Sequence, residues 1–249
     1  IARRQRQMCI RDRVWCIITA MITLSPTEIE VITLSCQVAL TSLLVNTIPA
    51  IYVGYMLARK EFWGKALFET LVFLPLALPP VVPGYLLLVL FGSQGIFGQY
   101  LSVIGLDFSF NWKGAVLASS IMGFPLMVQS VRLAIQLVDR QLELVATTLG
   151  ASRWQVFFGI TLPLAKTGIL VGAVLAFCRS LGEFGATITF VGNIAGETRT
   201  LPLAIYSLMQ QPDSETQIAR LISLSVVVAF IALGLSQWYN RKQQLRLAQ

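Results

Sequence analysis

Five long apolar runs restrict what this chain of 249 residues can fold into. Each has roughly the 20 or more residues that an α-helix needs to cross a lipid bilayer. The runs occupy residues 31–58, 66–91, 112–138, 163–191 and 216–239. Only 12% of the residues are charged, well below the roughly 25% of a soluble domain. We therefore predict an all-α integral membrane protein with one membrane domain over residues 21–249.

The charged residues predict the orientation of these spans. Lys and Arg form short clusters beside the apolar runs and no continuous basic face, so the net charge of +7 does not indicate a nucleic-acid-binding protein. Loops 59–65 and 139–163 and the C-terminal tail are positive, whereas loops 92–111 and 193–215 are neutral or acidic. Positive loops remain in the cytoplasm. From Met21 onward the N-terminus is therefore expected outside and the C-terminus inside, with the lipid bilayer as a partner.

Two interpretations are open for residues 1–20. They contain five Arg residues, and the apolar stretch at 14–24 is shorter than the roughly 20 residues of a membrane span. Met21 starts a more ordinary N-terminus, which favours a non-native or disordered extension before it. The alternative is an interfacial or partial helix, which gives six transmembrane helices instead of five.

Residue types that usually perform chemistry are scarce. The chain has no His, and its four Cys form no C-x-x-C pair, so the sequence predicts no metal site, cofactor site or disulfide framework. It also lacks the G-x-x-x-x-G-K-[ST] phosphate loop. We therefore predict no catalytic residue, and no ATP hydrolysis by this chain itself.

Prolines interrupt the run at 66–91, where Pro79, Pro80 and Pro83 are closely spaced. Each internal proline removes a helical hydrogen bond and clashes with the preceding turn. In lipid, the freed backbone must face protein or a water-lined cavity. We predict a kinked or unwound segment, in which these prolines either line a transport pathway or form a packing kink.

The run at 163–191 contains two ionisable residues, Arg179 and Glu183, one helical turn apart. Counted at 1.5 Å per residue from the start of the run, they lie in the outer half of the bilayer. Intramembrane ionisable residues are costly and are functional candidates. We interpret them as a gate that bends at Gly182 and Gly185. A structural ion pair is the alternative, and Arg179 would also suit a tetrahedral oxyanion.

The loop at 139–163 contains an amphipathic stretch that Gly150 divides. A short helix is expected at 142–149, ending at the glycine. Ser152 and Gln155 have the capping-box spacing that begins a second helix.

This loop has two candidate partners, a protein or the lipid surface. Trp and Arg are enriched at interface anchors, whereas an amphipathic helix also suits the lipid headgroups. Pro163 is expected to begin the next membrane helix. The predicted contact residues are Glu143, Ala146, Gly150, Ala151, Ser152, Arg153, Trp154, Phe157 and Pro163.

The same loop resembles the signature of ABC importer permeases, the EAA loop. Its core is a glycine, nine residues and Ile-x-Leu-Pro, which is matched here from Gly150 to Pro163. The resemblance implies a type I importer fold, in which the loop forms coupling helices that dock on a cytoplasmic ATPase. Glu143 lies one place earlier than in the general motif, which leaves its role open.

Three further segments resemble the molybdate permease branch: P-L-A-L-P-P-V-V-P-G, R-S-L-G-E-F-G-A-T-I-T-F-V-G-N and G-E-T-R-T-L-P-L-A-I-Y. That resemblance implies import of molybdate or tungstate through a homodimer in a bacterial or archaeal cell membrane. A periplasmic or surface binding protein would deliver the oxyanion. ATP and Mg would bind the separate ATPase, so no cofactor is expected in this chain.

Other functions are open alternatives. Sulfate or thiosulfate permeases share the outline of these motifs. An ion-coupled secondary transporter usually has internal inverted repeats, which the sequence does not reveal. A membrane scaffold without transport would not need Arg179 or Glu183 for any flux.

Overall fold

The computed structural model describes residues 25–105, 107–212 and 214–247, whose regular structure is entirely helical. Four helices are long and apolar enough to cross a membrane, and one bent pair is a candidate for a fifth crossing. The predicted all-α membrane architecture is therefore confirmed. Both interpretations of residues 1–20 concern a segment outside the described residues.

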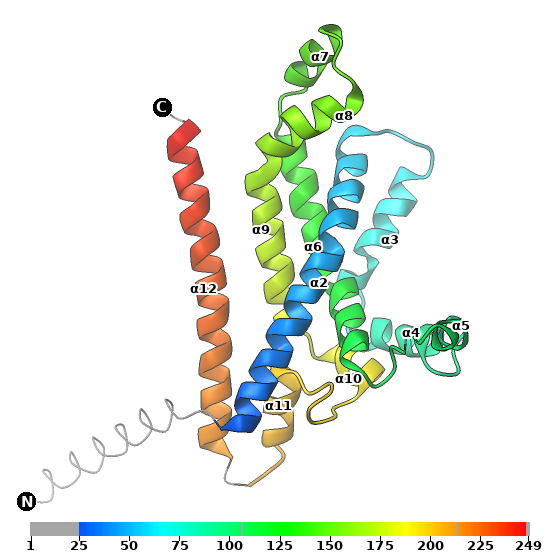
Figure 1. Cartoon of the computed structure of the whole chain (residues 1–249), viewed down its shortest axis with the longest axis vertical. Helices are drawn as coiled ribbons and strands as arrows, with labels where there is room; N and C mark the ends of the chain where they lie inside the picture. Colours follow the sequence, from blue (N-terminus) through cyan, green and yellow to red (C-terminus); the bar gives the residue numbers. More distant parts are fainter. Residues whose placement is uncertain (1–24, 106, 213, 248–249) are drawn as a thin grey trace, which may run out of the picture.

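The long helices are α2 (Pro26–Arg59), α6 (Trp112–Gln136), α9 (Leu162–Leu181) and α12 (Glu215–Leu247). The first begins at a capping box, because the Ser25 hydroxyl accepts the Glu28 N–H while the Glu28 carboxylate accepts the Ser25 N–H. In Figure 1, α2, α6 and α12 run toward one end of the molecule, and α9 returns from it.

Residues between α2 and α6 return the chain across the bundle through a broken span. It consists of α3 (Lys65–Ala77) and α4 (Val81–Phe91), which are bent by 110°. The interruption that the prolines predict is confirmed, but it separates two helices instead of kinking one. The predicted loop at 92–111 also contains a short helix, α5 (Gly98–Val103).

The predicted run at 163–191 differs from the observed helices at both ends. Helix α9 stops at Leu181, and α10 (Gly185–Val191) follows after a break. At the other end, the helix does not begin at Pro163. It begins at Arg153 as α8 (Arg153–Val156) and continues into α9 through η1 (Phe157–Thr161), a wide π-helical turn.

Proline chemistry explains this wide turn. Pro163 has no N–H to donate to the Gly159 carbonyl, and its ring would clash with that carbonyl in a regular helix. In the wide turn the Leu162 N–H reaches back to the Phe157 carbonyl instead. The loop segment that begins at Arg153 and helix α9 are therefore one continuous helical rod.

Two short helices complete the fold at opposite ends. The first, α7 (Arg140–Thr148), lies with α8 beyond the ends of α2 and α6 (Figure 1). The second, α11 (Leu201–Leu208), lies in the loop at 193–215 and packs near the start of α2.

A seam of small polar side chains joins α2, α6 and α9 inside the bundle. The Ser42 hydroxyl lies 3.2 Å from that of Ser180 and accepts from Ser120 at 3.1 Å. Asn46 donates to the Ser120 carbonyl at 2.9 Å. All four residues are buried. Interhelical hydrogen bonds and small residues of this kind hold membrane helices together without a hydrophobic driving force.

Helix α9 has a stripe of small residues that includes Gly168 and Gly172, and this stripe faces α6. A Cβ added to Gly172 would lie 2.8 Å from the Ser130 Cβ, and one added to Gly168 would overlap Ala134. These two helices are therefore as close as their backbones permit. In contrast, α12 packs mainly on α9 and α11, with an ion pair from Arg220 to Glu28 of α2, and 6% of its apolar stretch is buried.

We expect Gly172→Val to destabilise the purified protein by roughly 1–3 kcal/mol, because the larger side chain must push α6 and α9 apart. Thermal unfolding in detergent measures the change. Gly234→Val is the matched control, since a Cβ there meets no atom within 4 Å. Equal unfolding temperatures for the two variants would contradict close packing at Gly172.

Candidate functional site

The two helix breaks lie against each other. Leu78 to Pro80 separate α3 from α4, and Gly182 to Phe184 separate α9 from α10. A Cβ added to Gly185 would lie 2.7 Å from the Pro80 Cβ, and one added to Gly84 would lie 2.7 Å from the Ala186 carbonyl. The structure therefore brings Pro80 and Gly185 together, although they are distant in sequence.

The candidate gate residues differ in exposure. Pro83 is buried in the contact between α4 and α10, whereas Pro79, Pro80 and Gly182 are exposed at the surface of the single chain. The breaks thus have one side packed against protein and one side open. This is the arrangement required where an irregular backbone borders a cavity or a partner inside a membrane.

Glu183 connects the two halves of its interrupted span. Its side chain is 1% exposed and forms an ion pair with Arg179, whose side chain is 26% exposed. Its Oε1 atom accepts the Ala186 N–H at 2.8 Å, at the start of α10, where a carboxylate also complements the helix dipole. The ion pair that the spacing allowed is present, and the same carboxylate caps the next helix.

The loop after α10 contains a second polar cluster. The sequence motifs cover this region, but they do not single out the residues of the cluster. Arg199 donates from Nε to the Asn193 amide oxygen at 2.9 Å. The Asn193 amide nitrogen donates to the Ser207 hydroxyl of α11 at 2.6 Å. The cluster fixes the loop to α11 on the same side of the bundle as the breaks.

The loop between α6 and α9 folds as the predicted helix, glycine turn and helix. Gly150 has φ +90°, in the left-handed region that favours glycine. Its N–H donates to the Thr147 carbonyl and the Ala151 N–H to the Ala146 carbonyl, at 3.1 and 3.0 Å. These two bonds form a Schellman motif, and Ser152 begins α8 with the predicted capping box.

Apolar side chains of this loop point away from the rest of the chain. No residue of α7 is buried, Leu149 is 83% exposed, and Trp154 is 72% exposed. The Trp154 ring stacks on Phe158 with 5.9 Å between centroids. Because α7 lies past the ends of the membrane helices (Figure 1), its exposed face suits a protein partner better than the bilayer.

The base of the loop is fastened through Glu143. Its Oε1 atom accepts the Thr161 hydroxyl at 2.7 Å and the Arg59 guanidinium at 3.1 Å. Arg59 also donates to the Val138 carbonyl at 2.8 Å. The Arg59 and Glu143 side chains are only 11% and 15% exposed. The loop between α6 and α9 is thus tied to the last turn of α2 and to the wide turn before α9.

Sequence motifs singled out Glu143 but neither of its partners. Arg59 is 84 positions away and looked like an ordinary member of a positive loop. Thr161 stands in the variable position of Ile-x-Leu-Pro. Tyr55 was missed as well, and its ring contacts Phe157 edge-on with 4.9 Å between centroids.

Comparison with known proteins agrees with this geometry. Residues 50–244 match the family model described as binding-protein-dependent transport system inner membrane component. The molybdenum transport system permease protein ModB of Haemophilus influenzae is 54% identical over 89% of this chain and 97% of its own length. ModB of Escherichia coli K12 is 52% identical over 88% of this chain and 96% of its length.

More distant proteins share the architecture. The sulfate transport system permease protein CysW of Escherichia coli K12 is 33% identical over 90% of this chain and 78% of its own length. The crystal structure of a bacterial ABC transporter involved in alginate import superimposes with a TM-score of 0.70 at 24% identity, over 88% of this chain and 80% of that chain. At that identity the likeness concerns the fold alone.

The match to the family model spans most of the chain, and near-full-length relatives exceed half identity. This chain therefore belongs to the binding-protein-dependent transport system inner membrane components, the permease subunits of ABC transporters.

Proposed function

We propose that this chain is the permease subunit of an ATP-driven molybdate importer. The main support is the loop that extends past the membrane helices with an exposed apolar face and is fastened at Glu143. Such a loop offers a docking surface for a separate ATPase. Molybdate as the substrate is supported by the 54% identity to a molybdenum permease, against 33% for a sulfate permease.

Energy from the ATPase would enter through the rod that starts at Arg153. The helical segment Arg153–Leu181 has 29 residues, so it extends roughly 43 Å at 1.5 Å per residue. One end lies in the docking loop and the other adjoins Gly182 and Glu183. A displacement of the loop would therefore move the helix break directly, without passing through a flexible hinge.

Glu143 would act as a brace in this mechanism. Its carboxylate is engaged by Arg59 and Thr161 within the chain, so we assign the ATPase contact to the exposed residues around it. These are Gly150, Ser152, Arg153 and Trp154. The brace would make α2 and α9 move together when the ATPase pulls on the loop.

A second copy of the chain would complete the conduit. The open sides of the two breaks, at Pro79, Pro80 and Gly182, would face this copy across a pathway. A conduit must release its cargo as readily as it binds it, so we assign gating to Arg179 and Glu183, without a permanent oxyanion site. A binding protein would deliver molybdate at this outer end, and tungstate would share the route because it has the same shape and charge.

Gly150→Val should weaken ATPase docking. A β-branched residue at a left-handed φ stores roughly 1–3 kcal/mol of strain, equal to about a fivefold to one-hundredfold loss of affinity. Co-purification of the ATPase and vesicle uptake measure the effect. Gly150→Asn is the matched control, since asparagine tolerates this backbone region. Unchanged recruitment in the valine variant would oppose a docking role for the turn.

Arg179→Ala should raise ATP hydrolysis in the absence of substrate. The buried Glu183 carboxylate would lose its partner, and the arrangement of the helix break seen here would no longer be favoured. ATPase activity of the reconstituted complex, with and without binding protein, provides the measurement. Arg179→Lys keeps the charge and should remain closer to the parent protein. If the alanine variant lowers only the amount of folded protein, the pair is structural and the gate assignment is wrong.

Uptake into vesicles that contain the permease, its ATPase and the binding protein should saturate with molybdate and should persist in excess sulfate. Radiolabelled oxyanion uptake gives the result. Preference for sulfate would support the sulfate permease alternative. Uptake driven by an ion gradient without ATP would instead support a secondary transporter.

A further inference from the structure

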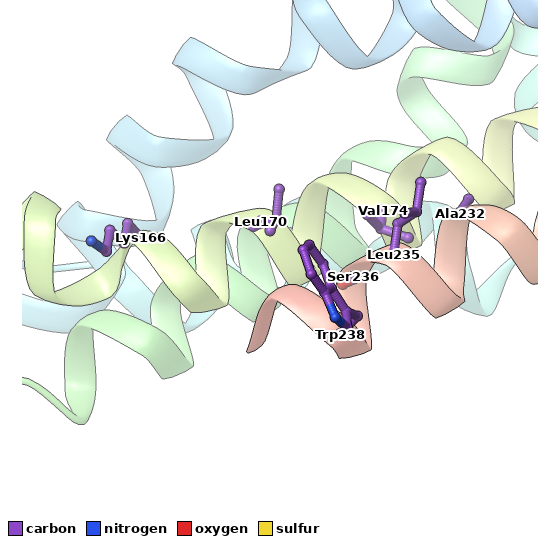
Figure 2. A pocket seen from close by; sticks show the side chains of 7 residues that line it. All are labelled: Lys166, Leu170, Val174, Ala232, Leu235, Ser236 and Trp238. Carbon is purple, nitrogen blue, oxygen red and sulfur yellow. The ribbon is translucent and has the colours of Figure 1, made fainter. Parts of the chain in front are cut away.

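An apolar groove separates α9 from α12 near the end that bears the docking loop, which is the loop at residues 139–163. It has a volume of about 600 Å³ and is lined by Lys166, Leu170, Val174, Ala232, Leu235, Ser236 and Trp238. Figure 2 shows these side chains along the two helices, with Lys166 at the opposite end of the row from Ala232. The groove is open to the outside of the single chain.

The basic end of the groove lies at the level of lipid headgroups. The apolar stretch of α12 ends at Trp238, and tryptophan marks the interface between membrane and water. One turn further, the Lys242 ammonium lies 5.2 Å from the Trp238 ring centroid. From Trp238 to Ala232 the groove descends roughly 9 Å into the membrane, which is suited to the first part of an acyl chain.

Among the described residues, Lys166 has no counter-ion. Its side chain is exposed, and no carboxylate of the described residues forms an ion pair with it. A cation held beside an apolar groove at the membrane boundary requires a mobile anion or an anionic headgroup.

Each acidic side chain that the structure describes at that end already has a partner within its own chain. Glu61 pairs with Lys65, Glu69 with Arg132 and Glu143 with Arg59. Asp139 caps the start of α7 by accepting the Gln141 N–H. The acidic side chains described at the docking-loop end are therefore all occupied, whereas the inner leaflet supplies phosphate groups at this depth.

We propose that this groove is a binding site for one anionic phospholipid of the cytoplasmic leaflet. Its phosphate would lie between Lys166 and Lys242, and one acyl chain would fill the groove along Leu170, Val174 and Leu235. Basic pockets between membrane helices on the cytoplasmic side are known to recognise such headgroups. The lipid would lie against the rod that begins at Arg153. Its presence would therefore influence how freely the rod moves. The assignment does not depend on what the chain transports.

Brominated lipids test this assignment without any transport assay. The full-length protein is placed in phosphatidylcholine vesicles that contain either brominated phosphatidylcholine or brominated phosphatidylglycerol. The chain has five Trp residues, so the signal of Trp238 is obtained by subtracting that of the Trp238→Phe variant. The comparison gives the relative association constant of the anionic lipid at this one site.

We expect phosphatidylglycerol to be preferred at Trp238, and Lys166→Gln to lower that preference by about fivefold, the effect of one basic residue near the headgroups. Lys166→Arg should retain the preference. Lys60→Gln controls for overall surface charge, because it removes an exposed cation just after α2, at the same end, and it should change nothing.

Equal quenching by the two lipids would overturn the proposal, and so would an unchanged preference in Lys166→Gln. Absence of Trp238 quenching by either lipid would mean that protein covers the groove, which equally rejects a lipid site.

Discussion

No water is available inside a bilayer to bind a free backbone N–H or carbonyl, and this constraint determines where the chain can be interrupted. Its two breaks occur after Ala77 and after Leu181, and each lies against the segment that contains the other. Pro80 contacts Gly185, and Glu183 satisfies the Ala186 N–H. Each irregular segment is thus covered by the helix that follows the other break, which makes a broken path through the membrane stable.

Elsewhere, three of the long helices are tightly packed. The glycine stripe on α9 and the serine seam hold α2, α6 and α9 together as one body. Because α9 is continuous with α8, this body extends from the docking loop to the breaks.

Charged side chains form one ion pair near the docking loop and another near the helix breaks. Near the docking loop, Arg59 and Glu143 fix the loop to the bundle. Near the breaks, Arg179 and Glu183 fix the end of α9 to the start of α10. Both are partly or fully buried pairs, in which loss of one partner leaves a costly unpaired charge. These two pairs lie near opposite ends of one helical rod.

The sequence by itself determined what depends on local physics: the apolar membrane helices, the interruption at the prolines, and the turn at Gly150 with its capping box. Length, charge, proline geometry and glycine φ act over a few residues, so they can be deduced from sequence order. Only the tertiary structure decided that Pro80 meets Gly185, that Arg59 and Thr161 hold Glu143, and that Lys166 borders a groove with α12. Those contacts join residues that are far apart in sequence, and packing alone selects their partners. The helix start at Arg153 instead of Pro163 belongs to the same class, because the wide turn absorbs the proline while Thr161 and Phe157 bind to neighbouring elements.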